Sequence, residues 1–137
     1  MSDHPHIVFV CEHGAAKSII AAAYFNKLAA ETSLQLRASA RGTNPDRELS
    51  TSAILGLRED GLTPEESIPQ ILSLEDVDSA QRIVSFCELP EDYHKKTFVE
   101  RWDDIPPVSE NYEKARDEIL ERLNRLIKEL RGQSFLK

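Results

Sequence analysis

A cysteine, a lysine and a serine lie within eight residues of one another near the N-terminus, in the stretch Cys11-Glu12-His13-Gly14-Ala15-Ala16-Lys17-Ser18. A thiolate is a far stronger nucleophile than a thiol, and a neighbouring cation or a helix N-terminus stabilises it. Lys17 supplies such a cation, and Ser18 can donate a hydrogen bond to the sulfur. The same features bind a tetrahedral oxyanion. The stretch therefore predicts an anion pocket that contains a nucleophile.

The residues between Cys11 and Lys17 are mostly small, which lets the backbone curl closely around an anion and turn its N–H groups toward it. A nucleotide-binding phosphate loop also ends in Lys-Ser after a strand. That motif requires glycine directly before the lysine and again five residues further back, where this chain has Ala16 and Cys11. The sequence excludes this alternative.

The stretch needs a strand before it and a helix after it. Residues 7–10 are all large and apolar, which is typical of a strand covered on both faces. Residues 19–31 are rich in alanine and long side chains, which favours a helix. Other patterns predict strands at 34–39, 82–87 and 97–102 and helices at 50–60, 73–78 and from 112 to about 132. Strands alternating with helices predict an α/β doubly wound parallel sheet, with ligands beyond the carboxyl ends of its strands.

Three further side chains follow predicted strands and are expected at the same edge of the sheet as Cys11. Cys87 ends the strand at 82–87, and Asp103 and Asp104 follow the strand at 97–102. A second thiol there can take part in thiol–disulfide exchange, and a carboxyl group can act as a general acid.

The whole chain, residues 1–137, is predicted to form one domain. Its net charge of −7 argues against binding to nucleic acid or to an acidic membrane surface. Two cysteines favour a reducing compartment, and the first residues lack the features of a signal peptide. A cytoplasmic protein is therefore expected. No spacing of cysteine and histidine predicts a zinc site, and no metal or other cofactor is expected.

Cys11-x5-Lys17-Ser18 after an apolar strand resembles the C-x5-R-S loop of the low-molecular-weight protein tyrosine phosphatases and of the related thioredoxin-coupled arsenate reductases. Ser39-Ala40-Arg41-Gly42-Thr43 resembles the family's S-A-G-T stretch with one extra residue. Ile83–Cys87 is similar to the arsenate reductase strand that ends in a second redox cysteine, and Trp102–Pro106 resembles the loop with the catalytic aspartate. The resemblance covers nearly the whole chain and implies a flavodoxin-like four-stranded parallel sheet.

The resemblance also implies roles for individual residues. Cys11 would attack phosphorus or arsenic, and an aspartate would protonate the leaving group. Asp104 is the first candidate for this acid and Asp103 the second, while His13 is an alternative proton donor. The oxyanion would be held by the backbone N–H groups of the loop, which belong to Glu12, His13, Gly14, Ala15, Ala16 and Lys17.

Three departures from the family pattern affect the predicted chemistry. The family places its catalytic aspartate next to proline, whereas this loop reads Asp103-Asp104-Ile105-Pro106-Pro107, and one alignment puts Pro107 at the catalytic position. The family's arginine is Lys17 here, and a point-like ammonium cannot grip two oxygens as a flat guanidinium does. Arg41, the extra residue in the Ser39–Thr43 stretch, is a candidate to restore a guanidinium to the pocket. Residues 88–96 contain no third cysteine, so Cys87 would resolve an adduct on Cys11 together with an external thiol.

These observations predict a cysteine-dependent phosphatase that hydrolyses phosphate monoesters through a cysteinyl-phosphate at Cys11. The first alternative is an arsenate reductase-like oxidoreductase that uses Cys11 and Cys87 with a thiol donor. The second is a degenerate relative that binds phosphate or another oxyanion without turnover, because Lys17 replaces the arginine. The expected partner is a phosphate-like oxyanion, or a phosphorylated small molecule or protein.

Overall fold

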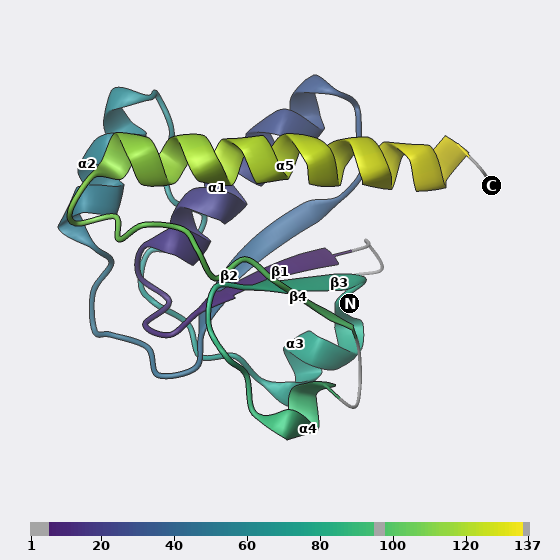
Figure 1. Ribbon diagram of the computed structural model, residues 1–137, viewed down its shortest axis with the longest axis horizontal. Helices are drawn as coiled ribbons and strands as arrows, with labels where there is room; N and C mark the ends of the chain where they lie inside the picture. Colours follow the sequence, from purple (N-terminus) through teal and green to yellow (C-terminus); the bar gives the residue numbers. More distant parts are fainter. Residues whose placement is uncertain (1–5, 95–97, 136–137) are drawn as a thin grey trace.

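A computed structural model describes residues 6–94 and 98–135, in which four strands form one parallel sheet (Figure 1). The strands are β1 His6–Cys11, β2 Arg37–Gly42, β3 Arg82–Ser85 and β4 Val99–Arg101, in the spatial order β2-β1-β3-β4. In this register Ile7 lies opposite Ala38 of β2 and Arg82 of β3. The predicted α/β fold with a four-stranded parallel sheet is confirmed.

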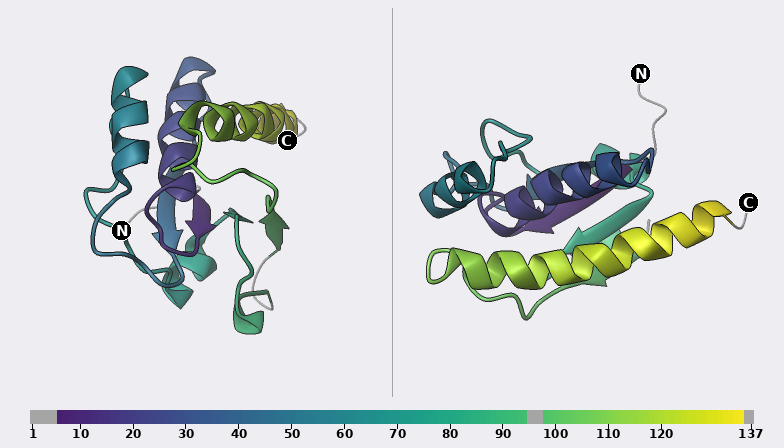
Figure 2. Two further views of the ribbon diagram at one scale, coloured as in Figure 1. Left: turned by 60° about the vertical axis from the view of Figure 1, so that its left-hand side comes forward. Right: turned by 90° about the horizontal axis from the view of Figure 1, so that it is seen from above.

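Helices cover both faces of the sheet. They are α1 Lys17–Glu31, α2 Thr51–Glu59, α3 Leu74–Ser79, α4 Glu91–His94 and α5 Tyr112–Phe135. Figure 1 shows α1, α2 and α5 on one side of the sheet and the short α3 and α4 on the other. Figure 2 shows α1 and α5 running side by side over the sheet, and they contact one another.

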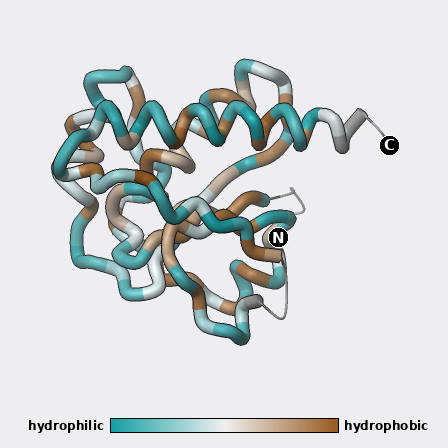
Figure 3. Tube along the Cα trace, viewed as in Figure 1, coloured by the Kyte–Doolittle hydropathy of each residue, from teal (hydrophilic) through white to brown (hydrophobic). Residues whose placement is uncertain are grey.

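The side chains of β1 alternate between two hydrophobic clusters, because successive residues of a strand point to opposite faces. Ile7 and Phe9 join the cluster under α1 and α5, whereas Val8 and Val10 join Val77 of α3 in the other. The four β1 residues from Ile7 to Val10 have no exposed surface. In Figure 3, α5 alternates along its length between hydrophilic and hydrophobic residues. The buried ones, which join the same cluster as Ile7 and Phe9, are Ala115, Ile119, Leu123, Leu126, Ile127 and Leu130. Within the described residues, no helix combines the length and the apolar character needed to span a membrane.

The second strand begins later than predicted, at Arg37 rather than at residue 34. Ser33 has a positive φ of 59°, and the N–H of Leu34 still donates to the carbonyl of Ala29, so the chain is leaving α1 at that point. The strand then continues to Gly42, which lies opposite Cys11 in the register. Its carboxyl end therefore reaches the loop that contains the predicted nucleophile.

Other boundaries differ at the ends of elements. β3 ends at Ser85, so Cys87 lies in the loop after the strand. β4 covers only the middle of the predicted strand at 97–102, whose first residue lies outside the described part of the chain. α4 was not predicted, and α5 continues beyond Gly132, which does not end it.

Local signals set the ends of α2 and α3. Ser50 caps α2 by accepting a hydrogen bond from the N–H of Ala53, and Ser73 forms a capping box with Asp76 at the start of α3. After α2, Gly61 takes a φ of +81° while the N–H of Leu62 donates to the carbonyl of Leu57. This arrangement is a Schellman motif, which glycine permits at no steric cost.

A polar cluster around Asp60 joins the end of α2 to the start of α5. The hydroxyls of Tyr24 and Tyr112 donate to Asp60 Oδ2 over 2.5 Å and 2.8 Å, and Arg116 Nη1 donates to Asp60 Oδ1 over 3.2 Å. Burial, followed by the hydrogen bond to Asp60, raises the pKa of Tyr24 to about 12. A Cβ added to Gly56 would overlap the Tyr112 ring, so this glycine lets α5 begin close to α2. The cluster fixes where the loop between β4 and α5 ends.

Candidate active site

Two glycines let the loop after β1 pack against the end of β2. Gly14 has a positive φ of 62°, and a Cβ added to it would lie 2.9 Å from the backbone nitrogen of Gly42. A Cβ added to Gly42 would lie 2.7 Å from the nitrogen of Gly14. Such distances are shorter than side chains tolerate, so glycine is needed at both positions. The close approach explains why the Ser39–Thr43 stretch contains a glycine.

The loop of residues 12–16 is held by segment 43–50, which runs beside it. Three backbone hydrogen bonds link the two, namely Asn44 N–H to Glu12 O (2.7 Å), Asp46 N–H to His13 O (3.0 Å) and Ser50 N–H to Ala15 O (2.9 Å). A fourth, from Thr43 N–H to Cys11 O (3.3 Å), joins the segment to the end of β1. The first three bonds occupy carbonyl groups of the loop. In the described part of the chain, no loop or turn carbonyl accepts a hydrogen bond from the N–H groups of residues 12–16. Those N–H groups are available to an anion.

The thiol of Cys11 lies at the end of β1, next to the first turn of α1. Its sulfur is 3.0 Å from the hydroxyl oxygen of Ser18, which is fully buried, while Cys11 is 8% exposed. Ala16 is the N-cap of α1 and contributes no side-chain cap. The first turn of the 15-residue helix therefore directs uncapped N–H groups toward the loop.

Cys11 opens onto a cavity of about 340 Å³. Its lining comes from the loop after β1, the segment after β2, the end of β3 and the loop before α5, namely Cys11, Glu12, His13, Ala15, Ala16, Lys17, Asp46, Ser50, Phe86, Cys87, Val108 and Ser109. Among the described residues, Lys17 forms no ion pair with a carboxylate. Its charge is therefore available to a ligand in this cavity. In the same part of the chain, no three His, Cys, Asp or Glu side chains gather as a metal site would require.

The second cysteine lines the same cavity as the first, as the parallel sheet predicts. Burial raises the pKa of the Cys87 thiol. The hydrogen bond with Ser85 lowers this pKa, and the charge of a neighbouring Cys11 thiolate raises it further. The Ser85 hydroxyl donates to the carbonyl of Cys87 over 2.6 Å and lies 3.6 Å from its sulfur. Each cysteine thus has its own serine neighbour: the Ser18 hydroxyl lies beside the Cys11 sulfur, and the Ser85 hydroxyl lies beside the Cys87 sulfur.

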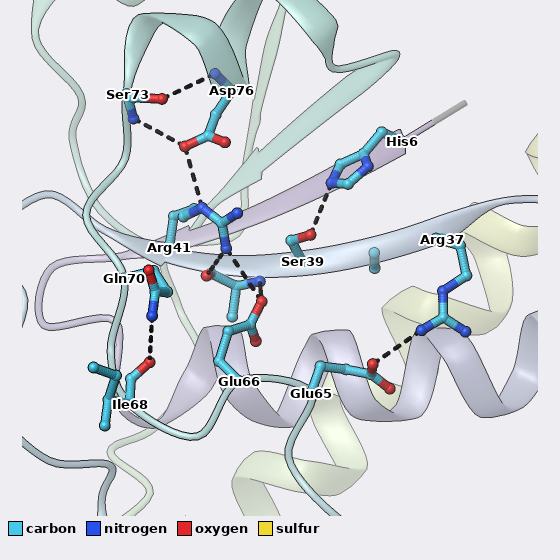
Figure 4. A network of polar contacts seen from close by, with 12 residues as sticks. His6, Arg37, Ser39, Arg41, Glu65, Glu66, Ile68, Gln70, Ser73 and Asp76 are labelled. Carbon is cyan, nitrogen blue, oxygen red and sulfur yellow. Dashed lines mark hydrogen bonds and ion pairs between the residues drawn. The ribbon is translucent and has the colours of Figure 1, made fainter. Parts of the chain in front are cut away.

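The structure does not bring Arg41 to the cavity, contrary to the hypothesis that it replaces the family's guanidinium. Its Nε donates to Asp76 Oδ2 and its Nη1 to Glu66 Oε2, each over 3.1 Å (Figure 4). A further bond from Nη1 reaches the carbonyl of Ala40 over 2.8 Å. Two carboxylates from later segments therefore hold the guanidinium at the edge of β2.

The aspartates predicted as general acids also lie outside the cavity lining. Asp103 pairs with Arg101 over 3.2 Å, and Asp104 accepts a hydrogen bond from Arg122 over 2.6 Å. The bond from Arg122 holds the pKa of Asp104 below its ordinary value. Both carboxylates are exposed, whereas their neighbours Trp102 and Ile105 are buried.

Other residues of that loop and of the segment after β2 line the cavity instead. Val108 and Ser109 follow the two prolines of the loop, and Asp46 and Ser50 follow β2. Asp46 Oδ1 lies 3.2 Å from Nδ1 of His13. Asp46 is not among the predicted site residues, because it lies well beyond the predicted strand at 34–39 and reaches the cavity only through the contact between segment 43–50 and the loop.

Comparison with known families gives a match over nearly the whole chain. The model of the low molecular weight phosphotyrosine protein phosphatases matches residues 6–135. The chain belongs to this family. Curated proteins gave no match.

Several solved structures have the same fold as this chain. YfkJ from Bacillus subtilis is 18% identical, with a TM-score of 0.82 over 96% of this chain and 98% of its own. The YwlE arginine phosphatase from Geobacillus stearothermophilus is 22% identical, with a TM-score of 0.77 over 96% of both chains. An arsenate reductase from Archaeoglobus fulgidus is 28% identical, with a TM-score of 0.69 over 89% of this chain and 98% of its own. Phosphatases and arsenate reductases thus both occur among the similar structures.

Proposed function

We propose that this protein is a cysteine-dependent phosphatase that hydrolyses phosphate monoesters through a cysteinyl-phosphate at Cys11. The observation that carries the proposal is the arrangement at this sulfur. It lies 3.0 Å from the Ser18 hydroxyl and opens onto a cavity whose lining includes Glu12, His13, Ala15, Ala16 and Lys17; Gly14 of the loop is not part of the lining. A nucleophile beside oxyanion-binding groups is what phosphoryl transfer through a covalent intermediate requires.

In the first step, the Cys11 thiolate attacks phosphorus and the bond from phosphorus to the ester oxygen breaks. The loop N–H groups and Lys17, which pairs with no carboxylate in the described part of the chain, stabilise the negative charge on the equatorial oxygens in the transition state. In the second step, water attacks the cysteinyl-phosphate and the electron pair of the S–P bond returns to sulfur. The Ser18 hydroxyl then donates its hydrogen bond to the leaving thiolate.

The test is hydrolysis of an aryl phosphate by the purified chain, with two cysteine variants. We expect slow turnover in the wild type and a loss of about four orders of magnitude in Cys11→Ser, because a serine hydroxyl without an activating base is a poor nucleophile. Cys87→Ser is the matched control, since Cys87 lines the same cavity. Activity that survives in Cys11→Ser would contradict the proposal.

A second candidate function follows from one specific observation, the presence of both cysteines in one cavity. An arsenate reductase would bond Cys11 to arsenic. Cys87 would then attack the Cys11 sulfur, so that a disulfide forms and arsenic leaves reduced from As(V) to As(III). An external thiol would reduce the disulfide.

Arsenate-dependent oxidation of a thiol donor separates this candidate from the phosphatase. A reductase loses this activity in Cys87→Ser, whereas a phosphatase retains its aryl phosphate hydrolysis in that variant. Tight binding of inorganic phosphate with neither activity would instead indicate a relative that binds oxyanions without turnover.

A further inference from the structure

We propose that His13 donates the proton to the leaving group and that Asp46 positions the His13 ring. The inference rests on the proposed phosphatase function, and it assigns the general acid to the anion loop and the segment beside it. Both residues line the cavity onto which the nucleophile Cys11 opens.

His13 and Asp46 are joined by two contacts. Asp46 Oδ1 lies 3.2 Å from Nδ1 of the ring, and the backbone N–H of Asp46 donates to the carbonyl of His13 over 3.0 Å. The backbone hydrogen bond joins the same two residues as the side-chain contact, and it therefore keeps the Asp46 carboxylate beside the His13 ring. A base and an orienting carboxylate in this relation are the usual components of an acid–base dyad.

The contact between Asp46 and Nδ1 determines which nitrogen of the His13 ring can donate a proton to the leaving group. A protonated His13 ring forms an ion pair with Asp46 on its Nδ1 side, so the other nitrogen of the imidazolium, Nε2, carries the transferable proton. Nε2 lies 4.0 Å from Glu12 Oε1, which is beyond hydrogen-bond distance. The His13 side chain is 54% exposed, so a leaving group at the cavity mouth has access to it.

The carboxylates expected to act as the acid are occupied elsewhere. Asp103 pairs with Arg101 and Asp104 with Arg122, and neither lines the cavity. The loop that bears them contributes Val108 and Ser109 to the cavity instead. Histidine, whose ordinary pKa is near neutrality, can both donate and accept a proton at physiological pH.

The proton transfers balance over the two steps of the reaction. In the first, the electron pair of the P–O bond moves to the ester oxygen, which takes the Nε2 proton of the His13 imidazolium and leaves as the alcohol. In the second, the neutral imidazole accepts a proton from the water that attacks phosphorus, and the S–P electron pair returns to Cys11. Inorganic phosphate leaves, and both residues regain their starting state.

The test compares two substrates that differ in their need for an acid. The dinitrophenolate of 2,4-dinitrophenyl phosphate leaves without protonation, whereas the phenolate of phenyl phosphate requires it. We expect His13→Asn, which keeps an N–H near Asp46, to lower kcat/KM about 10²–10³-fold for phenyl phosphate and less than about threefold for the dinitrophenyl ester. His6→Asn is the matched control, because His6 contacts Ser39 at the opposite end of β1, and it should change neither value.

The positioning role of Asp46 is tested separately, by the Asp46→Asn variant alone and in combination with His13→Asn. We expect Asp46→Asn to produce the same selective loss for phenyl phosphate, with a smaller magnitude of about tenfold. In the His13→Asn background, Asp46→Asn should then cause no further selective loss, because the group that it positions is gone. Additive losses in the double variant would overturn the positioning role.

Two further outcomes would overturn the inference while the phosphatase stands. One is an equal loss for both substrates in His13→Asn, which indicates a structural role. The other is a selective loss for phenyl phosphate in Asp103→Asn or Asp104→Asn, which identifies a carboxylate of the β4–α5 loop as the donor. If the wild type hydrolyses neither ester through Cys11, the proposed function itself fails, and the inference fails with it.

Discussion

Two loops at the carboxyl edge of the sheet differ in how they meet the cavity. The loop between β1 and α1 places Cys11, Glu12, His13 and Lys17 in the cavity lining. The loop between β4 and α5 contributes Val108 and Ser109 to the lining, while its two aspartates pair with arginines at the protein surface.

The difference follows from how each loop is held. The first is short, and backbone hydrogen bonds to segment 43–50 fix it between a buried strand and a helix N-terminus. The second is longer and is held by side chains, with Trp102, Ile105 and Val108 buried and Tyr112 bound to Asp60. The position of a residue at the end of a buried strand, such as Cys11, can be predicted from the sequence that flanks it, whereas the direction of an exposed carboxylate depends on its tertiary partners.

The backbone constraint on the first loop is tested by adding one methyl group. In Gly14→Ala the new Cβ would lie 2.9 Å from Gly42 N at a φ of +62°. We expect a loss of about 2–4 kcal/mol in the free energy of unfolding, from backbone strain and overpacking together. Hydrolysis should fall at least about 100-fold, since small displacements at a site have effects of that size. Urea unfolding and kcat/KM measure the two effects.

Gly61→Ala is the control for that substitution. Gly61 also has a positive φ, of 81°, but a Cβ there would meet nothing within 4 Å. We expect it to lose only about 1 kcal/mol, the cost of the backbone conformation, and to keep full activity. Equal effects of the two substitutions would show that contact between Gly14 and Gly42 does not shape the loop.

Removal of the Ser18 hydroxyl tests the polar environment that the first loop gives its cysteine. Ser18→Ala should slow breakdown of the cysteinyl-phosphate about ten- to hundredfold, the value of one hydrogen bond to a charged group. Because formation is less affected, product should appear as a burst followed by a slow steady state. Ser85→Ala, beside the other cysteine, is the control, and a burst in that variant as well would contradict a specific role for Ser18.

The side-chain anchoring of the second loop is tested at Tyr112. Burial, followed by the hydrogen bond to Asp60, raises its pKa above the ordinary value for tyrosine. A raised pKa contributes stability that is fully present below pH 10 and is lost as pH rises further, when the unfolded state releases the proton first. Tyr112→Phe should lower the free energy of unfolding at pH 8 by about 1 kcal/mol and flatten its decline above pH 10. An unchanged decline would contradict the anchoring.

The smallest effect is expected at the aspartates of the second loop. Asp104→Asn removes a carboxylate that is 76% exposed and pairs with Arg122 outside the cavity lining. We expect kcat/KM for aryl phosphates to change less than about threefold, because no contact with the reacting atoms is lost. A loss of about 100-fold, typical of a missing general acid, would show that this loop moves to the nucleophile during the reaction.

The sequence analysis succeeded where chain connectivity alone determines position. The strand that ends in Cys11 and the strand that precedes Cys87 lie side by side in one parallel sheet, so both thiols reach the same edge of the sheet and line one cavity. It did not place Arg41, because the Glu66 and Asp76 carboxylates that hold the guanidinium come from segments 25 and 35 residues further along the chain. It missed Asp46 for the same reason, since only the approach of Gly14 to Gly42 brings the segment after β2 beside the anion loop.

The most direct test of the account is to trap the covalent intermediate. The chain is mixed with a radiolabelled aryl phosphate, quenched in acid within milliseconds, digested and analysed for labelled peptides. The account predicts about one phosphate per chain, bound to the Cys11 sulfur, and none in Cys11→Ser. Release of the alcohol without label on Cys11, or label on another residue, would contradict it.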